Sequence, residues 1–275
     1  MGTPNETDTR EIRGEFVATY YPPRDAERRG TCILVLGGSE GGLPDFFAQM
    51  FTSQGYATMA LAYCGFESLP PRIDRIPLEY FRNAIDWLLK RPELVGARLV
   101  IGAISKGAEL ALLLASRDCR IRGVIAYSPS SVVFQGIPDE DGVAGASWTW
   151  EGEPLVHVPY DLGGGRPPDD IYGLYCDSLR QTEEVTRATI PVEQINGPVL
   201  LFSGGQDKMW PSGEMAEMIC QRLKAHRFPH RFSHKSFEQA GHVFSEYVTE
   251  LGGTAEANRD AGFASAEIAF EFLSG

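Results

Sequence analysis

Short apolar runs alternate along the chain with longer segments in which apolar residues recur at helical spacing. The apolar runs predict buried strands, and the first run partly alternates with polar residues, as an edge strand does. Predicted strands cover residues 14–21, 32–36, 56–63, 99–102, 123–127, 198–203 and 228–237. Predicted helices cover residues 44–53, 78–89, 106–115, 212–223 and 255–273. Because strands and helices take turns, we expect an α/β fold with a doubly wound, mainly parallel sheet.

The alternation lapses between residues 128 and 197, a stretch rich in glycine, proline, aspartate and aromatic residues. Long irregular connections inside a domain are usually functional, so we predict an irregular cap insertion over an active site. Its apolar residues are candidates for a substrate pocket: Val132, Val133, Phe134, Trp148 and Trp150. The alternative is a peripheral excursion whose aromatic side chains pack on the domain. We expect one domain over residues 14–275, preceded by a flexible N-terminus at 1–13.

The segment around Ser105 carries the strongest chemical signal. An apolar run ends at Gly102, and Ser105 then stands among small residues directly before a helical pattern. This order of strand, sharp turn and helix matches the nucleophile elbow of α/β-hydrolases, in which a serine is exposed above the sheet edge. The usual pattern is Gly-x-Ser-x-Gly; here Ala103 replaces the first glycine and Gly107 keeps the second. The alternative is an ordinary strand–helix turn with a surface serine.

A nucleophilic serine needs a histidine base and a carboxylate that orients the base, in the chain order Ser, Asp or Glu, His in this fold. Asp207 follows a predicted strand and a glycine turn, so it is the expected acid, whereas Glu214 and Asp177 have no strand directly before them. His242 lies between the last predicted strand and the last predicted helix, which makes it the expected base. The remaining histidines either precede the acid or stand among basic residues typical of a solvated surface: His157, His226, His230 and His234.

The glycine-rich segment at residues 37–42 supplies candidates for an oxyanion hole, whose donors are backbone N–H groups. We expect one donor at Lys106, directly after the nucleophile, and the other at Ser39, with Glu40 as second choice and as a pocket residue. The segment lacks the Gly-Lys-Ser/Thr and Gly-x-Gly-x-x-Gly patterns, so nucleotide binding is not expected. The predicted chemistry requires no cofactor and no metal.

Charge is distributed unevenly along the 275 residues, which carry 25 basic and 37 acidic side chains, a formal net charge of −12. Between residues 128 and 197, twelve acidic residues stand against three arginines and no lysine, so nucleic acid is not an expected partner. No apolar run is long enough for a membrane span and the N-terminus lacks an apolar signal core, so we expect a cytoplasmic protein. The five cysteines form no Cys-x-x-Cys pair, so we expect buried free thiols.

Five segments together resemble the catalytic domain of the acyl-CoA thioesterase and bile acid-CoA:amino acid N-acyltransferase family, which is related to dienelactone hydrolases. They are residues 37–43 (GGSEGGL), 77–81 (PLEYF), 104–110 (ISKGAEL), 210–212 (WPS) and 240–242 (AGH). The resemblance spans residues 14–273 and implies an α/β-hydrolase fold with Ser105, Asp207 and His242 as catalytic triad. Members that conjugate amino acids resemble this chain but carry cysteine as nucleophile, so Ser105 favours hydrolysis.

We therefore expect a serine hydrolase that cleaves a small-molecule ester or thioester, with acyl transfer to water through an acyl-enzyme on Ser105. Acyl transfer or cyclisation from the same acyl-enzyme is one alternative, and a non-catalytic binding module with a hydrolase fold is another. Coenzyme A is a polyanion, and animal members of the family carry an additional N-terminal β domain that this sequence does not contain. Together with the acidic segment, this favours a neutral or carrier-bound acyl substrate over free acyl-CoA.

Overall fold

A mainly parallel sheet forms the centre of the computed structural model, which describes residues 9–24, 30–137, 144–162, 167 and 169–275. The sheet has eight strands in the order β1-β2-β4-β3-β6-β7-β10-β11. Their bounds are β1 (Arg10–Arg13), β2 (Val17–Tyr21), β3 (Thr31–Leu36), β4 (Ala57–Ala62), β6 (Arg98–Ile104), β7 (Ile121–Tyr127), β10 (Val199–Gly204) and β11 (Phe232–Phe237). Strand β2 pairs antiparallel with both of its neighbours, and all other pairs are parallel. The predicted α/β-hydrolase fold is confirmed.

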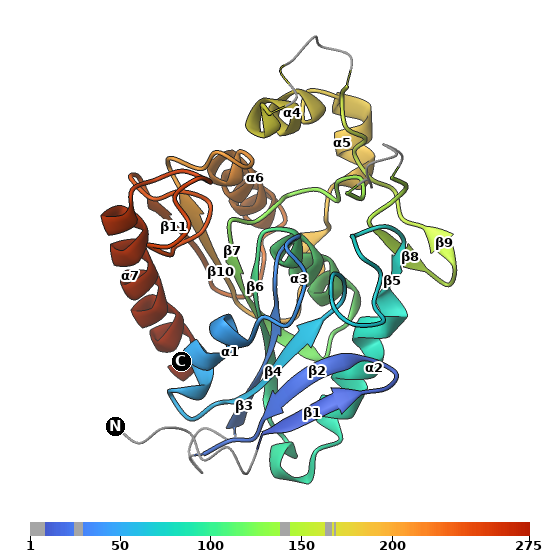
Figure 1. The fold of residues 1–275 in the computed structure, drawn as a ribbon, viewed down its shortest axis with the longest axis vertical. Coiled ribbons are helices and arrows are strands. Elements are labelled where there is room, and N and C mark those ends of the chain that lie inside the picture. The colour runs from blue at the N-terminus through green and yellow to red at the C-terminus, as the bar shows by residue number, and fades with distance from the viewer. Residues whose placement is uncertain (1–8, 25–29, 138–143, 163–166, 168) are drawn as a thin grey trace.

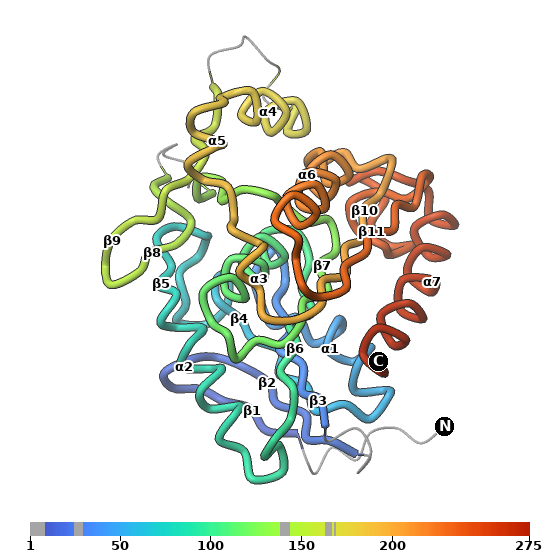
Figure 2. The backbone as a smooth tube through the Cα atoms, turned by 180° about the vertical axis from the view of Figure 1, so that it is seen from behind, coloured from blue at the N-terminus to red at the C-terminus, as the bar shows by residue number. Residues whose placement is uncertain are grey.

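Helices cover both faces of this sheet (Figures 1 and 2). One face carries α1 (Asp45–Thr52) and α7 (Ala255–Ser274); the other carries α2 (Leu78–Leu89), α3 (Lys106–Arg117) and α6 (Ser212–Ala225). Successive side chains of β3 serve the two layers in turn, since Ile33 and Val35 belong to the first core and Leu34 and Leu36 to the second. A strand buried on both faces reads as a continuous apolar run, which is why β3 was recognisable in the sequence.

The described part of the predicted cap insertion contains regular structure that the sequence analysis did not predict. It comprises β8 (Trp148–Trp150), β9 (Glu153–Pro154), α4 (Ile171–Ser178), α5 (Thr182–Ala188) and the 3₁₀ helix η3 (Val192–Gln194). Strands β8 and β9 join β5 (Ile76–Pro77) in a small second sheet, and another 3₁₀ helix, η2 (Pro92–Leu94), follows α2. Helices α4 and α5 stand above the sheet, at the end where its parallel strands finish (Figure 1). Helices of seven or eight residues are too short to repeat an apolar stripe, so periodicity did not reveal them.

Most element boundaries differ from the predictions by a few residues, and the differences are largest at the two edges of the sheet. Residues Arg10–Arg13 were expected in a flexible N-terminus, but they form β1 and pair with β2; residues 1–8 lie outside the described part. The largely charged sequence of β1 hides this strand, because it has a single apolar residue, Ile12, and pairs along its backbone with β2. At the opposite edge, β11 begins at Phe232 and not at residue 228, because Pro229 lacks the N–H that a ladder needs.

The cysteines are only partly as expected. All five are free, and Cys32, Cys64 and Cys220 are buried, but Cys119 is exposed and Cys176 is half-buried. Cys119 lies in the turn between α3 and β7, where the chain runs over the surface. Within the described ranges, no helix combines the length and the apolar character that crossing a bilayer demands.

Candidate active site

Ser105 occupies the turn that joins β6 to α3. Its backbone has φ 58° and ψ −127°, a conformation that L residues rarely adopt. The Ser105 N–H donates to the Tyr127 carbonyl at the end of β7, and the Ser105 carbonyl accepts the N–H of Ala108 in α3. Such backbone strain costs about 1–3 kcal/mol and persists where surrounding contacts enforce it, most often at functional sites. The strained strand–helix turn has the form expected of a nucleophile elbow, and the role of Ser105 as nucleophile stays a prediction.

Close packing around the elbow explains its small residues. A Cβ atom on Gly107 would lie 2.1 Å from the carbonyl oxygen of Gly37 and 2.8 Å from that of Leu36, so no larger residue fits. Ala103, in contrast, lies within β6 and is fully buried, with Leu36 and Ala126 opposite it on the neighbouring strands. Its methyl group is part of the core. The elbow therefore accepts alanine at the first position of the usual pattern and requires glycine at the second.

The three predicted triad residues lie in contact at the carboxyl ends of the parallel strands. Asp207 follows β10 and His242 follows β11, so the strand order brings both to the serine. His242 Nε2 lies 2.9 Å from Ser105 Oγ, and His242 Nδ1 lies 2.9 Å from Asp207 Oδ2. In this geometry an imidazole can take the serine proton while the carboxylate holds the ring orientation.

Backbone and side-chain donors fix the Asp207 carboxylate in place. Its Oδ1 accepts the N–H groups of Met209 and Trp210, at 2.8 and 3.2 Å. Its Oδ2 accepts the Ser212 hydroxyl at 2.6 Å as well as the His242 ring nitrogen. Charge-assisted hydrogen bonds to an ionised carboxylate are stronger than neutral ones, so the turn after β10 is organised around this anion.

Ser128 ties the His242 segment to the opposite side of the site. The Ser128 hydroxyl donates to the His242 carbonyl at 2.7 Å, and the Ser128 carbonyl accepts the indole N–H of Trp210 at 3.2 Å. The Trp210 ring stands edge-on to the His242 ring, with 5.8 Å between centroids. Sequence reasoning did not identify Ser128; its position directly after an apolar strand was the available signal. Trp210 was noted only within a family-like segment.

The glycine-rich loop after β3 packs against Ser105. A Cβ on Gly38 would lie 3.1 Å from Ser105 Cβ. The buried Tyr63 hydroxyl donates to the Gly37 carbonyl at 2.7 Å and lies 3.1 Å from that of Gly38. Burial raises the pKa of Tyr63 well above its usual range, so the hydroxyl keeps its proton. The Gly38 N–H donates to the Glu40 carboxylate at 2.9 Å, so this anion lies on the loop that packs against Ser105.

The two predicted oxyanion donors belong to segments that flank Ser105. Lys106 is the first residue of α3, where backbone N–H groups have no acceptor within the helix. Ser39 follows Gly38 in the loop and is exposed. Their positions suit backbone donation to an oxygen above Ser105, and their role as oxyanion donors stays a prediction.

The Lys106 side chain forms a buried ion pair with Glu109. Lys106 Nζ lies 2.7 Å from Glu109 Oε1 and 2.8 Å from the Ser147 hydroxyl, and both charged side chains are shut off from solvent. Glu109 also accepts the backbone N–H of Phe134 and the indole N–H of Trp148. Burial lowers the pKa of Lys106 and raises that of Glu109. The pair fastens two stretches of the insertion to α3, the helix that begins directly after Ser105.

The insertion residues predicted as pocket residues are packed on the domain. Val132, Phe134 and Trp148 are fully buried, and Val133 nearly so. The Trp148 ring contacts those of Tyr63 and Phe81. Trp150 lies under the Arg82 guanidinium, 5.1 Å from the centroid of the indole ring. This packing matches the alternative reading of the insertion, and a substrate contact by any of these residues stays a prediction.

A second set of serine, histidine and carboxylate joins β10 to β11 and α6, and it consists of Ser203, His234 and Glu217. His234 was expected on a solvated surface, but its Nε2 lies 2.7 Å from Ser203 Oγ and its Nδ1 lies 2.9 Å from Glu217 Oε1. Ser203 is fully buried within β10, so no substrate reaches its hydroxyl. The contacts instead join β10, β11 and α6.

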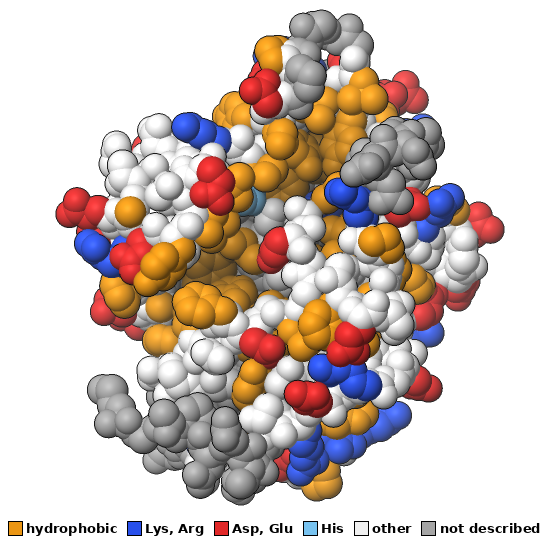
Figure 3. Space-filling model, in the orientation of Figure 1, with side chains coloured by type: hydrophobic (Ala, Val, Ile, Leu, Met, Phe, Trp, Pro, Cys, Tyr) orange, Lys and Arg blue, Asp and Glu red, His pale blue; other side chains and the backbone are white. Residues whose placement is uncertain are grey.

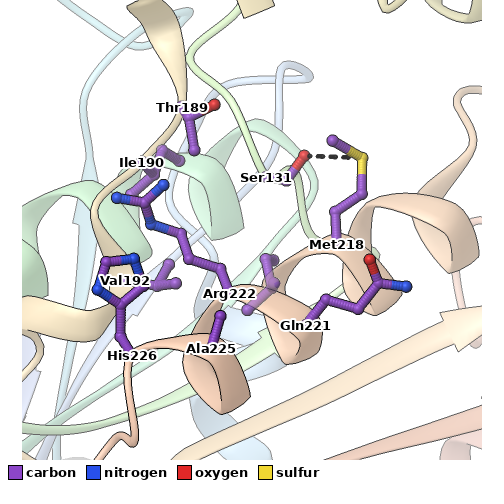
Figure 4. A pocket seen from close by; sticks show the side chains of 10 residues that line it. Ser131, Thr189, Ile190, Val192, Met218, Gln221, Arg222, Ala225 and His226 are labelled. Atoms are coloured by element: carbon purple, nitrogen blue, oxygen red, sulfur yellow. Dashed lines mark hydrogen bonds between the residues drawn. The ribbon is translucent and has the colours of Figure 1, made fainter. Parts of the chain in front are cut away.

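The surface of the described residues is hollowed in at least two places. Figure 3 shows one lined mainly by hydrophobic side chains, between the region of α4 and that of α1 and α7. Another, of about 390 Å³, lies between α6 and residues 189–192 (Figure 4). Its Arg222 is paired with Glu193, and none of the triad residues lines it. Among the described residues, no group of three or more His, Cys, Asp or Glu is placed to hold a metal ion.

Comparison with known proteins adds a family and a fold. A family model described as "BAAT / Acyl-CoA thioester hydrolase C terminal" matches residues 76–246, a range that contains all three triad residues. Acyl-coenzyme A thioesterase 1 of Homo sapiens is 32% identical over 217 residues, which are 78% of this chain and 48% of that protein. Bile acid-CoA:amino acid N-acyltransferase of Mus musculus is 28% identical over 244 residues, 87% of this chain and 54% of that protein. The chain thus spans about half the length of these relatives.

A solved structure supports the fold independently. A putative dienelactone hydrolase from Klebsiella pneumoniae superposes with a TM-score of 0.60 at 14% sequence identity, covering 97% of both chains. At this identity the likeness concerns the fold alone.

Proposed function

The chain belongs to the BAAT / acyl-CoA thioester hydrolase C-terminal family, and on that premise we propose that it is a serine hydrolase of acyl thioesters or esters. The observation that carries the proposal is the unbroken series of 2.9 Å contacts from Ser105 Oγ through His242 to Asp207. The strained backbone of Ser105 supports it, because an ordinary strand–helix turn has no need of that strain.

In the proposed reaction, Ser105 Oγ attacks the substrate carbonyl while His242 Nε2 takes the hydroxyl proton. Asp207 holds the Nδ1–H of the ring and stabilises the imidazolium that forms. The N–H groups of Ser39 and Lys106 stabilise the tetrahedral oxyanion. The leaving group departs with the proton from His242, and water releases the acyl group by the same steps, with His242 now acting as base for the water.

The decisive experiment is covalent labelling of the whole chain by a fluorophosphonate probe, followed by peptide mass analysis. We expect one modified peptide that contains Ser105, and no label on the Ser105→Ala variant. We also expect this variant to lose thioester hydrolysis by several orders of magnitude while its thermal unfolding stays near that of the wild type. A folded wild-type protein that takes no label at any pH would favour a non-catalytic binding module.

Acyl transfer to an amine is the second candidate, and the likeness to an amino acid N-acyltransferase supports it. Serine at position 105 favours water as the acceptor. Glycine added to the hydrolysis assay distinguishes the two reactions. Free acid as the main product over a wide range of glycine concentration supports hydrolysis, and N-acylglycine that grows at the expense of free acid supports transfer.

We further propose that the leaving group is neutral or carrier-borne rather than free coenzyme A. The Glu40 carboxylate lies on the loop that flanks Ser105, and acidic residues predominate in the insertion. Three of the latter (Asp139, Glu140 and Asp141) and Arg166 lie outside the described residues. A negative field near the entrance opposes a polyanion, and salt screens it over about 8 Å at physiological strength.

A salt series tests this preference. The specificity constant for an acyl-CoA is compared with that for the same acyl group on N-acetylcysteamine, a neutral thiol. We expect the neutral thioester to be favoured at low salt and the difference to shrink as salt is added. Greater efficiency on acyl-CoA at low salt would overturn the preference and leave the proposed chemistry intact.

A further inference from the structure

The end of β7 contacts the segments of all three proposed triad residues, although it contributes none of them. In the sheet, β7 lies between β6, which leads to Ser105, and β10, which leads to Asp207. The Tyr127 carbonyl, at the last position of β7, accepts the Ser105 N–H at 3.0 Å. Ser128, the next residue, directs its polar groups to the segments that carry Asp207 and His242.

All three polar groups of Ser128 have partners around the site. Its N–H donates to the Phe202 carbonyl of β10 at 2.8 Å. Its carbonyl accepts the indole N–H of Trp210, whose main-chain N–H donates to the Asp207 carboxylate. Its hydroxyl donates to the His242 carbonyl at 2.7 Å. One residue thus contacts the strand before the acid, the turn that holds the acid and the backbone of the base.

The backbone of Ser128 is held in a conformation that directs these groups. Its φ is 46°, in the left-handed region that residues other than glycine rarely adopt. Such a conformation persists where surrounding contacts enforce it, most often at functional sites. Ser128 and His242 are both buried, so solvent does not replace the hydroxyl as donor to the His242 carbonyl.

We propose that Ser128 is a positioning residue for the hydrolysis, because its hydroxyl fixes the main chain at His242 and thereby the place of the imidazole. The inference rests on the proposed function and adds a residue that acts through His242. The imidazole lies 2.9 Å from both Ser105 Oγ and Asp207 Oδ2, so a shift of its main chain alters both contacts. A misplacement of about 1 Å can lower a rate by about a hundredfold.

The experiment compares Ser128→Ala with Ser130→Ala in the hydrolysis of the acetyl thioester of N-acetylcysteamine. Ser130 is the matched control, because it is also fully buried and its hydroxyl donates at the same 2.7 Å to a backbone carbonyl, that of Val132. We expect Ser128→Ala to lower kcat and kcat/KM together by about tenfold to a hundredfold, which leaves KM unchanged. We expect Ser130→Ala to keep the wild-type kcat and KM.

A spectroscopic measurement separates positioning from a general loss of structure. The proton between His242 Nδ1 and Asp207 gives a far-downfield proton NMR signal while that hydrogen bond is intact. We expect this signal in wild type and in Ser130→Ala, and a shifted or broadened signal in Ser128→Ala. Ser128→Gly is the second variant, because glycine suits the left-handed backbone and also lacks the hydroxyl. It should lose kcat by the same factor as Ser128→Ala.

Three outcomes would overturn the positioning role of Ser128. They are a wild-type kcat in either folded Ser128 variant, an equal loss of kcat in Ser130→Ala, and an unchanged downfield signal in Ser128→Ala. Each of them leaves the proposed function intact as long as the wild type is labelled at Ser105 and turns over substrate. A wild-type protein without turnover and without that label would instead contradict the proposed function.

Discussion

Lys106 and Glu109 form an ion pair inside the protein, 2.7 Å apart and without access to solvent. Lys106 directly follows Ser105, and Glu109 lies one turn further along α3. The pair holds the backbone of Phe134 and the side chains of Ser147 and Trp148. Lys106 also carries one of the two backbone N–H groups predicted for the oxyanion, so the buried contacts of its side chain help to fix where that N–H lies.

Replacing Lys106 with methionine should destabilise the protein by about 3–5 kcal/mol, because Glu109 is left as a buried charge without its partner. The double variant Lys106→Met/Glu109→Gln should lose less, since the uncompensated charge is gone. Urea unfolding measures both values. Arg120→Met at the exposed pair with Asp86 is the control and should cost about 1 kcal/mol or less. A double variant less stable than the single one would contradict this account.

The Lys106→Met variant should also become less stable as pH rises. Burial raises the pKa of Glu109, and removal of the cation raises it further. In the unfolded chain Glu109 loses its proton above a pKa of about 4.3, whereas in the folded variant it keeps the proton to a higher pH. The free energy of unfolding therefore falls as pH rises from the unfolded pKa to the raised pKa of the folded variant. Unfolding curves at several pH values from 4 upward measure the slope. A difference in free energy of unfolding between wild type and variant that does not grow with pH would contradict this prediction.

Ser105→Gly should unfold at a higher temperature than Ser105→Ala, although neither variant hydrolyses substrate. Both lack the hydroxyl, but only glycine adopts the backbone conformation of residue 105 without strain. Relief of 1–3 kcal/mol of strain is partly offset by the greater freedom of glycine in the unfolded chain, which leaves a gain of about 1 kcal/mol. Differential scanning calorimetry of the pair measures it, and equal melting temperatures would indicate that the elbow is not strained.

Gly107→Ala should cost far more than Ala103→Gly. The added methyl group at 107 meets the Gly37 carbonyl and displaces the loop beside the nucleophile, so both stability and turnover should fall strongly. Ala103→Gly restores the usual elbow pattern and removes one buried methyl group, at a cost of about 1 kcal/mol with turnover largely kept. Soluble yield, unfolding temperature and kcat are compared for the two variants.

Tyr63→Phe should lower kcat by about tenfold and leave KM nearly unchanged. The hydroxyl anchors the carbonyl of Gly37, so its loss loosens the loop that carries the predicted Ser39 donor. The effect should be smaller than that of removing an oxyanion donor itself, which lowers kcat by about a hundredfold or more. Burial raises the pKa of Tyr63 well above its usual range, so the hydroxyl does not ionise in the assay. The ratio of kcat between wild type and Tyr63→Phe should therefore be the same at pH 6 and pH 9. A KM effect alone would indicate a binding role instead.

Local sequence predicted the strands and helices that carry the site, because the buried strands are continuous apolar runs and the helices are long enough to show their period. Chain order then selected Asp207 and His242. The same reasoning did not find α4, which is short, or β1, whose largely charged residues show no alternation.

Whether an apolar residue is buried was beyond this reasoning for a different reason. An apolar residue that packs in the core and one that lines a groove look alike in a sequence, and only tertiary packing separates Trp148, which is buried, from Phe46, which is exposed. The residues that support the site from a distance, such as Ser128, meet it only after folding.

The Ser203–His234–Glu217 set has a consequence for the recognition of enzymes by structural templates. A search that compares only the distances among a hydroxyl, an imidazole and a carboxylate would return two matches in this chain, with similar contact lengths. Backbone conformation and exposure separate them, since Ser203 lies within a regular strand and Ser105 in a left-handed turn. Templates that also record the main-chain torsion angles of the serine would exclude the Ser203–His234–Glu217 set.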